Sequence, residues 1–433
     1  MNDSQPAQLR RSLGFWALVF YGVGDILGAG IYALVGKVAG VAGSASWAAF
    51  GVALVVAGLT ALTYAELGGR FPRSAGESVF TGQAFGRPGL SLLVGWMVLS
   101  SGILSLATVS VAFGGYMSGL VPGLSPSATV VGILLLLAAI NFRGMRESST
   151  TNIIATMVEL TGLLIVIVVG ALFLERSPDA GILQTIEAGR AAGWTEITSG
   201  AALGFFAFIG FEDMVNVAEE VKDPERNMPR AILTALCVTG IIYLLVVLVA
   251  TSVVPPAELG VSEAPLLSVV QRATEVVPDR LFTLIALFAV ANTGLLNFIM
   301  ASRLIYGMSR QGLLPSALGA VHQRRRTPHL AVVTVLAVAL ALALSGTLTF
   351  LAGTTSLLLL LVFFTVNVSL MAIKRRERPS RRTFCAPRWV PLVGAISCLG
   401  LMPFVPRSSL LTAAIIIALG GGLVLFRGRR SEA

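Results

Sequence analysis

The residues best suited to chemistry in this chain are glycines placed around a carboxylate. Asp25 lies in an apolar stretch of about 13–36 and is flanked by Gly22, Gly24, Gly28 and Gly30. About 20 apolar residues span a membrane as a helix, but glycines weaken helices and a carboxylate is costly in lipid. A helix-packing face of small residues is the alternative explanation of the glycines. Asp25 favours an interrupted membrane helix instead.

An interrupted membrane helix exposes backbone polar groups, which are tolerated at membrane depth only inside protein or beside a wet cavity. Free N–H groups at the start of a half-helix bind anions, and free carbonyls at an end attract cations. Together they can hold a zwitterion, as in secondary transporters.

A second stretch repeats the pattern further along the chain. Between 204 and 214 an apolar run leads through Gly210 to Glu212 and Asp213. The two stretches lie in the first and sixth apolar segments, at corresponding places in successive groups of five. This spacing predicts two inverted five-helix repeats with a binding site at their interface.

Composition sets the class of protein that must position these residues. Hydrophobic residues make up 55% of the chain and charged residues 12%, against about 25% charged in soluble domains. The sequence is therefore that of an all-α polytopic membrane protein. Its net charge of +9 fits basic cytoplasmic loops, and no basic domain with interleaved aromatic residues indicates a nucleic-acid partner.

Several functional classes are disfavoured. The three cysteines have no disulfide or metal-ligand spacing, and the two histidines, His322 and His329, both flank a basic turn. We expect no metal, no cofactor and no enzyme activity. The chain lacks the phosphate-binding string G-x-x-x-x-G-K-[ST] that would indicate an ATP-driven pump. It also lacks a short apolar core followed by a cleavage site, so we expect the first helix to stay in the mature protein.

Hydropathy predicts twelve membrane segments. They are 13–36, 46–68, 90–119, 127–142, 152–174, 196–218, 230–253, 280–308, 330–345, 348–372, 390–405 and 408–426. All but six of the 31 basic residues fall in the tails and the even-numbered connections; the six are Lys37, Arg176, Arg190, Arg272, Arg280 and Arg407. This asymmetry predicts a multi-pass protein of the cell (inner or plasma) membrane with both termini in the cytoplasm.

Four motifs, in order, resemble those of the amino acid–polyamine–organocation (APC) permeases over nearly the whole chain. The run from Gly22 to Tyr32 resembles the family's G-x-G-x-x-x-G-x-G-I-[FY] first helix. The other three motifs are Tyr64-Ala65-Glu66-Leu67 with Pro72 and Gly76, Gly210-Phe211-Glu212 with 218–224 and 228–230, and Ser302-Arg303 with 310–315.

The resemblance implies the LeuT-like fold of five plus five helices with two accessory helices. The expected divisions are a cytoplasmic tail 1–12, repeats 13–174 and 196–372, accessory helices 390–426 and a cytoplasmic tail 427–433.

The resemblance also implies a binding site between the first and sixth segments. The substrate carboxylate would meet N–H groups of Gly28, Ala29, Gly30 and Ile31. Its ammonium group would meet carbonyls around Ile26, Phe208, Ile209 and Phe211. Phe206 and Phe208 fit an aromatic lid or plain packing, and Asn297 falls where relatives contact the substrate side chain.

Three polar residues are candidates for coupling or gating. Glu159 stands where many family members carry a lysine, so it could take and release a proton or form a helix–helix hydrogen bond. Glu212 matches a position associated with gating. A sodium site built from Glu159, Thr293 and first-helix carbonyls is the alternative to protons. Asp25, neutral in many relatives, could contact a substrate amine or make a packing or gating hydrogen bond.

The expected function is secondary active transport of an amino acid, driven by protons or by exchange. A cationic amine, polyamine or basic amino acid is the alternative substrate, because of Asp25, Glu159, Glu212 and Asp213. A sensor that binds without transporting is the alternative from another class. The expected partners are the small-molecule substrate, a coupling proton and the lipid bilayer.

Overall fold

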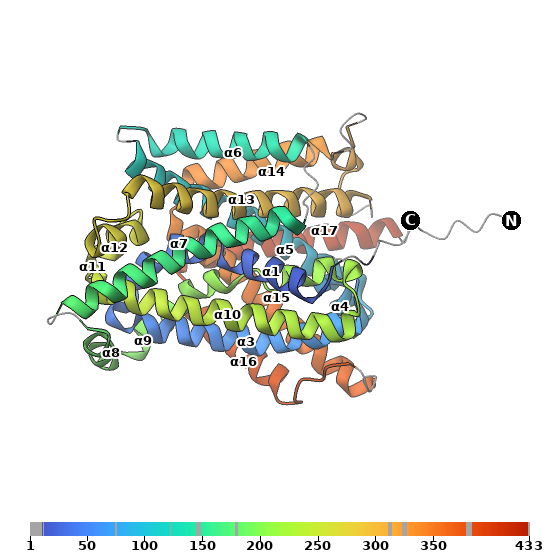
Figure 1. Ribbon diagram of the computed structural model, residues 1–433. Helices are drawn as coiled ribbons and strands as arrows, with labels where there is room; N and C mark the ends of the chain where they lie inside the picture. The colour runs from blue at the N-terminus through green and yellow to red at the C-terminus, as the bar shows by residue number, and fades with distance from the viewer. Residues whose placement is uncertain are drawn as a thin grey trace.

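The computed structural model is a bundle of helices (Figure 1). It describes residues 11, 13–73, 76–121, 123–143, 149–177, 181–310, 314–322, 327–377 and 383–431. No β-strand occurs within these ranges, where one isolated bridge pairs Leu13 with Val221. Most of the predicted tail 1–12, the last two residues of 427–433, part of the 310–315 motif and basic residues at 146, 324–326, 378, 381 and 382 lie outside the described residues.

Long apolar helices make up the bundle, which confirms the prediction of an all-α polytopic membrane protein. In the described part of the chain, nine helical stretches are long and apolar enough to cross a membrane. The first runs from Phe15 to Arg70 and covers two predicted segments. The others lie in α5 (Pro88–Leu120), α6 (Pro126–Arg143), α7 (Ser149–Arg176), the stretch Trp194–Glu220, α10 (Pro224–Val253), α13 (Asp279–Arg310), α15 (Leu348–Arg376) and α17 (Arg407–Ser431). Two shorter apolar helices are α14 (His329–Ser345) and α16 (Val390–Leu401).

Burial separates central helices from peripheral ones. In the apolar 18-residue stretch of each helix, 78% of the residues of α5 are buried, against 28% in α7 and 17% in α17. In a membrane protein the exposed apolar faces of peripheral helices meet lipid. Helix α5 is therefore central, while α7 and α17 present apolar surface to the bilayer.

The short connecting helices lie at two opposite ends of the bundle. Figure 1 shows α4 (Gly76–Phe85) at one end and α8 (Ile182–Arg190), α11 (Pro256–Val261) and α12 (Pro265–Ala273) at the other. Proline at the start of α5, α10, α11 and α12 suits the first turn, where a missing N–H costs nothing.

Both predicted interruptions are present. The first segment is α1 (Phe15–Leu27) and α2 (Ala29–Ala42), separated at Gly28, whose ψ of −146° is not helical. The sixth is α9 (Trp194–Gly204) followed by two 3₁₀ helices, η2 (Phe205–Phe208) and η3 (Asp213–Glu220). Between these, Gly210 has a φ of +130°, a conformation that residues with a Cβ rarely adopt.

Candidate functional site

The two interruptions touch each other through their backbones. A Cβ atom added to Gly30 would lie 2.6 Å from the Cα of Ala207 in η2. A Cβ added to Gly210 would lie 2.8 Å from the carbonyl carbon of Asp25 and 2.9 Å from the nitrogen of Ile26. These separations are closer than a real Cβ tolerates, so glycine is what lets the broken segments meet.

The N-terminus of α2 lies at the first break. Its N-cap is Gly28, which has no side chain of its own to cap the first turn. The N–H groups of Gly28, Ala29, Gly30 and Ile31 lie at this end, where the first N–H groups of a helix have no acceptor within the helix itself. The side chain of Ala29 lies outside what is described. Thr293 of α13 lies directly against the break, because its own Cβ is 3.0 Å from where a Cβ on Gly28 would stand.

Aromatic residues enclose the opposite side of the break. The Tyr243 hydroxyl of α10 donates a hydrogen bond to the Ile26 carbonyl. The Phe208 ring lies 5.3 Å from the Tyr243 ring and 6.1 Å from that of Phe50 in α3 (Ser46–Arg70). Phe208 is thus packed between rings, as in the packing interpretation; the lid interpretation stays a prediction.

The remaining sixth-segment candidates lie close by. Phe206 is buried, and its carbonyl accepts a hydrogen bond from the Ile209 N–H at 3.3 Å. Phe211 is buried between Tyr64 and Phe363, with ring centroids 5.6 and 5.3 Å away. Asp25 is half-buried beside the break.

Glu159 is a fully buried carboxyl in α7. Its Oε1 accepts a hydrogen bond from Asn292 Nδ2 of α13 at 3.0 Å, and its backbone carbonyl accepts one from the Tyr32 hydroxyl at 2.8 Å. Among the described residues, Oε2 has no hydrogen-bond partner and no cation pairs with this side chain. A buried carboxyl with this single amide partner is suited to carrying a proton.

Thr293 and Asn297 lie one turn apart on α13. Asn297 is half-buried and donates from Nδ2 to the Thr293 carbonyl at 3.0 Å. The sequence predicts Thr293 near Glu159. In the structure Asn292, the residue before Thr293, hydrogen-bonds Glu159, and Thr293 itself lies against Gly28.

Glu212 is tied to the second break. It is buried, and its Oε2 accepts a hydrogen bond from the Gly210 N–H at 2.8 Å. Two further carboxyls lie near it: Asp213 accepts from Asn216 at 3.1 Å, and Glu77 of α4 accepts from the Tyr64 hydroxyl at 3.2 Å. Burial raises the pKa of Glu77 to about 7, and the charge of Asp213 adds to this.

This raised pKa predicts a pH-dependent stability. The pKa of this carboxyl is about 7 in the folded protein, against an ordinary value of 4.5. The free energy of unfolding therefore falls as the pH rises from about 4.5 to about 7. The melting temperature in detergent should therefore fall less over this pH range in Glu77→Gln than in the wild type. Glu275→Gln, at an exposed position, is the control. An unaltered profile in Glu77→Gln would contradict the assignment.

Sequence reasoning missed three partners of the site: Asn292, Tyr243 and Thr156. Thr156 of α7 donates to the Phe20 carbonyl at 3.2 Å and fills the space beside Gly24. Each is a polar residue within an apolar segment, which is a usable signal. Nothing in the local sequence tells which helix such a residue faces.

The sequence is similar to known transport proteins along most of its length. Residues 13–424 match the family described as "Amino acid permease". The branched-chain amino acid permease BcaP of Bacillus subtilis (strain 168) is 27% identical, covering 92% of this chain and 88% of that protein. The methylthioribose transporter of the same organism is 28% identical, over 96% and 93%. Human cationic amino acid transporter 4 is 31% identical, over 76% of this chain and 54% of that protein.

Proposed function

Because the chain belongs to the amino acid permease family of the APC superfamily, we propose that it is a secondary active transporter that moves an amino acid by alternating access. The family and the relatives above are transport proteins, so the protein is a transporter of small molecules and not an enzyme. The observation that carries the proposed site is the direct contact between the two broken segments at Gly30 and Gly210.

The proposed substrate position follows from the backbone groups at the breaks. The carboxylate takes N–H groups of the first turn of α2, from Gly28 to Ile31, at the N-terminus of a half-helix that begins at the break. The ammonium group takes carbonyls near Ile26 and at Phe208, Ile209 and Phe211. The Ile26 carbonyl already accepts from Tyr243, but a carbonyl oxygen has two lone pairs.

A cationic substrate is the second candidate. It is favoured by the half-buried Asp25 beside the break and by the similarity to a cationic amino acid transporter. A sensor without transport remains the candidate from another class and predicts binding without flux.

The test is a thermal-shift screen of the purified protein against single amino acids and amines, followed by uptake of the stabilising compounds into proteoliposomes. We expect an amino acid to raise the melting temperature and to accumulate. Stabilisation without uptake would favour the sensor, and stabilisation by amines lacking a carboxylate would favour the second candidate.

The proposed architecture has twelve membrane helices. It consists of the repeats 13–174 and 196–372 and two accessory helices within 390–426. The interruptions in the first and sixth segments support the repeat, because inverted repeats carry their broken helices at corresponding positions.

Both termini are proposed to lie in the cytoplasm, on the basis of the basic residues. Ser380, within the most basic connection, lies outside the described residues. A cysteine at this position, Ser380→Cys in a chain whose native cysteines are replaced by serine, should resist an impermeant thiol reagent applied to intact cells. Rapid labelling from outside would overturn the orientation.

A further inference from the structure

The connection between α15 and α16 carries a strong positive charge. Residues 374–390 contain seven basic residues and one acidic residue, Glu377. The structure describes the two ends of this connection, 374–377 and 383–390. Both ends adjoin apolar helices, because α15 is long and apolar enough to cross a membrane and α16 is a shorter apolar helix. The described basic residues therefore lie where membrane helices end.

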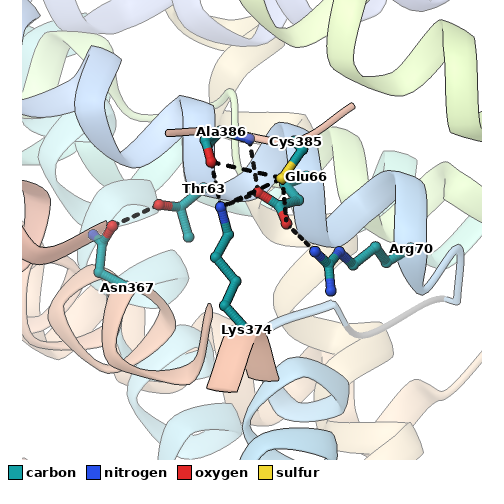
Figure 2. Close-up of polar contacts among 7 residues, drawn as sticks. All are labelled: Thr63, Glu66, Arg70, Asn367, Lys374, Cys385 and Ala386. Atoms are coloured by element: carbon teal, nitrogen blue, oxygen red, sulfur yellow. Dashed lines mark hydrogen bonds and ion pairs between the residues drawn. The ribbon is translucent and has the colours of Figure 1, made fainter. Parts of the chain in front are cut away.

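A buried carboxylate holds the second end of the connection in place (Figure 2). Glu66 of α3 is fully buried and pairs with Arg70 and with Lys374, the latter at 2.8 Å. It also accepts a hydrogen bond from the Ala386 N–H at 2.8 Å, and Lys374 donates to the Ala386 carbonyl. Both backbone polar groups of Ala386 are thus bonded, two residues before Arg388. Because one carboxylate meets two cations, this cluster adds positive charge to the same end of the bundle.

Three further arginines are exposed around this cluster: Arg375, Arg376 and Arg388. Arg376 donates from Nη1 to the Ala84 carbonyl at 3.0 Å, which ties the end of α15 to the last turn of α4. A carbonyl group has no net charge, so this bond leaves the charge of the guanidinium uncompensated. Within the described residues no ion pair involves any of the three arginines. Their charges are therefore available to an anion from outside the chain.

Trp389 shows how this end of the connection lies relative to the membrane. It directly precedes α16, and its side chain is 58% exposed. The exposed large apolar residues of α16 follow it at intervals of three or four, so they share one helix face with it: Leu392, Val393, Ile396 and Leu399. An apolar face of this kind meets lipid, and tryptophan is enriched at the level of the lipid headgroups. Arg388, the preceding residue, is therefore at headgroup level.

We propose that the basic corner formed by Arg375, Arg376, Arg388 and Trp389 binds a phospholipid with an anionic headgroup. The guanidinium groups take the phosphate oxygens, for which their planar fork of N–H donors is suited. The acyl chains lie along the exposed face of α16. A soluble phosphate would satisfy the arginines but leave this apolar face uncovered, so a lipid is the occupant that fits both. Binding of this lipid does not require the proposed transport function.

Native mass spectrometry of the full chain in a neutral detergent tests the proposal, with phosphatidylglycerol and phosphatidylcholine of identical acyl chains as probes. We expect phosphatidylglycerol to bind at least about fivefold more tightly, since one basic residue near an anionic lipid surface contributes about this factor. Arg375→Gln combined with Arg388→Gln should remove this preference and leave phosphatidylcholine binding unchanged. Arg190→Gln combined with Arg280→Gln is the matched control, because both arginines are exposed and lie in α8 and at the start of α13.

Two results would overturn the proposal directly. One is equal affinity for the two lipids in the unmodified chain, and the other is an unaltered preference in the Arg375 and Arg388 double variant. Displacement of phosphatidylglycerol by millimolar inorganic phosphate would also overturn it, because the site would then take a free anion and not a lipid.

Trp389→Ala gives a second measurement that leaves every charge in place. We expect it to weaken the binding of both lipids by a similar factor, because the tryptophan ring contacts the lipid without distinguishing the headgroups. The preference for phosphatidylglycerol should therefore persist in this variant. Unaltered binding of both lipids in Trp389→Ala would contradict the placement of the lipid along α16.

Discussion

We expect Gly210→Ala to lower substrate uptake by at least about tenfold, because glycine alone suits both the backbone and the space at this position. Its φ is +130°, and a Cβ would lie 2.8 Å from the backbone of Asp25. The methyl group would push the second break away from the first. The carbonyls around Ile209 would then leave the position that we propose for them beside the substrate.

Uptake into proteoliposomes measures this effect, and thermal unfolding establishes whether the variant is folded. Gly58→Ala is the matched control, because Gly58 lies within α3 and a Cβ there meets no atom within 4 Å. Wild-type uptake by a folded Gly210→Ala protein would show that contact between the breaks is not needed for transport.

The second large effect concerns energy coupling at Glu159. We expect uptake to be stimulated by an inward proton gradient, to be independent of sodium, and to lose its proton dependence in Glu159→Gln. The carboxyl is buried, and Asn292 is the one side chain found to hydrogen-bond it within the described residues. Glutamine keeps a hydrogen-bonding oxygen for Asn292 but cannot exchange a proton.

Flux under imposed pH or sodium gradients, together with substrate binding, decides between the mechanisms. Glu159→Gln should bind substrate with an affinity within about threefold of the wild type, since the carboxyl is not placed on the substrate. Glu187→Gln, on the exposed surface of α8, should behave as the wild type. Uptake that follows sodium, or an unaltered pH response in Glu159→Gln, would exclude proton coupling at this residue.

The class of fold and both helix interruptions were predictable from the sequence. Membrane helices are visible in the sequence as long apolar runs, because few other structures satisfy the backbone hydrogen bonds within lipid. The breaks at Gly28 and Gly210 were also visible, since glycine and acidic residues stand out against an apolar background.

Partners between helices were not predictable in the same way. Thr293 and Asn292 are adjacent in sequence, but a helix turns by about 100° per residue, so they face different neighbours. The hydrogen bond to Glu159 comes from Asn292, which the sequence did not single out. Glu66 lies within one of the four motifs, yet its pairing with Lys374, more than 300 positions away, depends on how α3 and α15 pack.

The isolated bridge at the start of α1 has an energetic consequence of its own. Leu13 and the stretch from Glu220 to Lys222 exchange two backbone hydrogen bonds, each of 2.9 Å. Such bonds contribute about 1 kcal/mol each after competition with water. Two such bonds favour the state in which Leu13 is bonded over the state in which it is not by about thirtyfold. By these bonds alone, the start of α1 is therefore detached a few per cent of the time. This pair of bonds keeps the start of the first segment attached to the sixth most of the time, and thermal fluctuation is enough to break it.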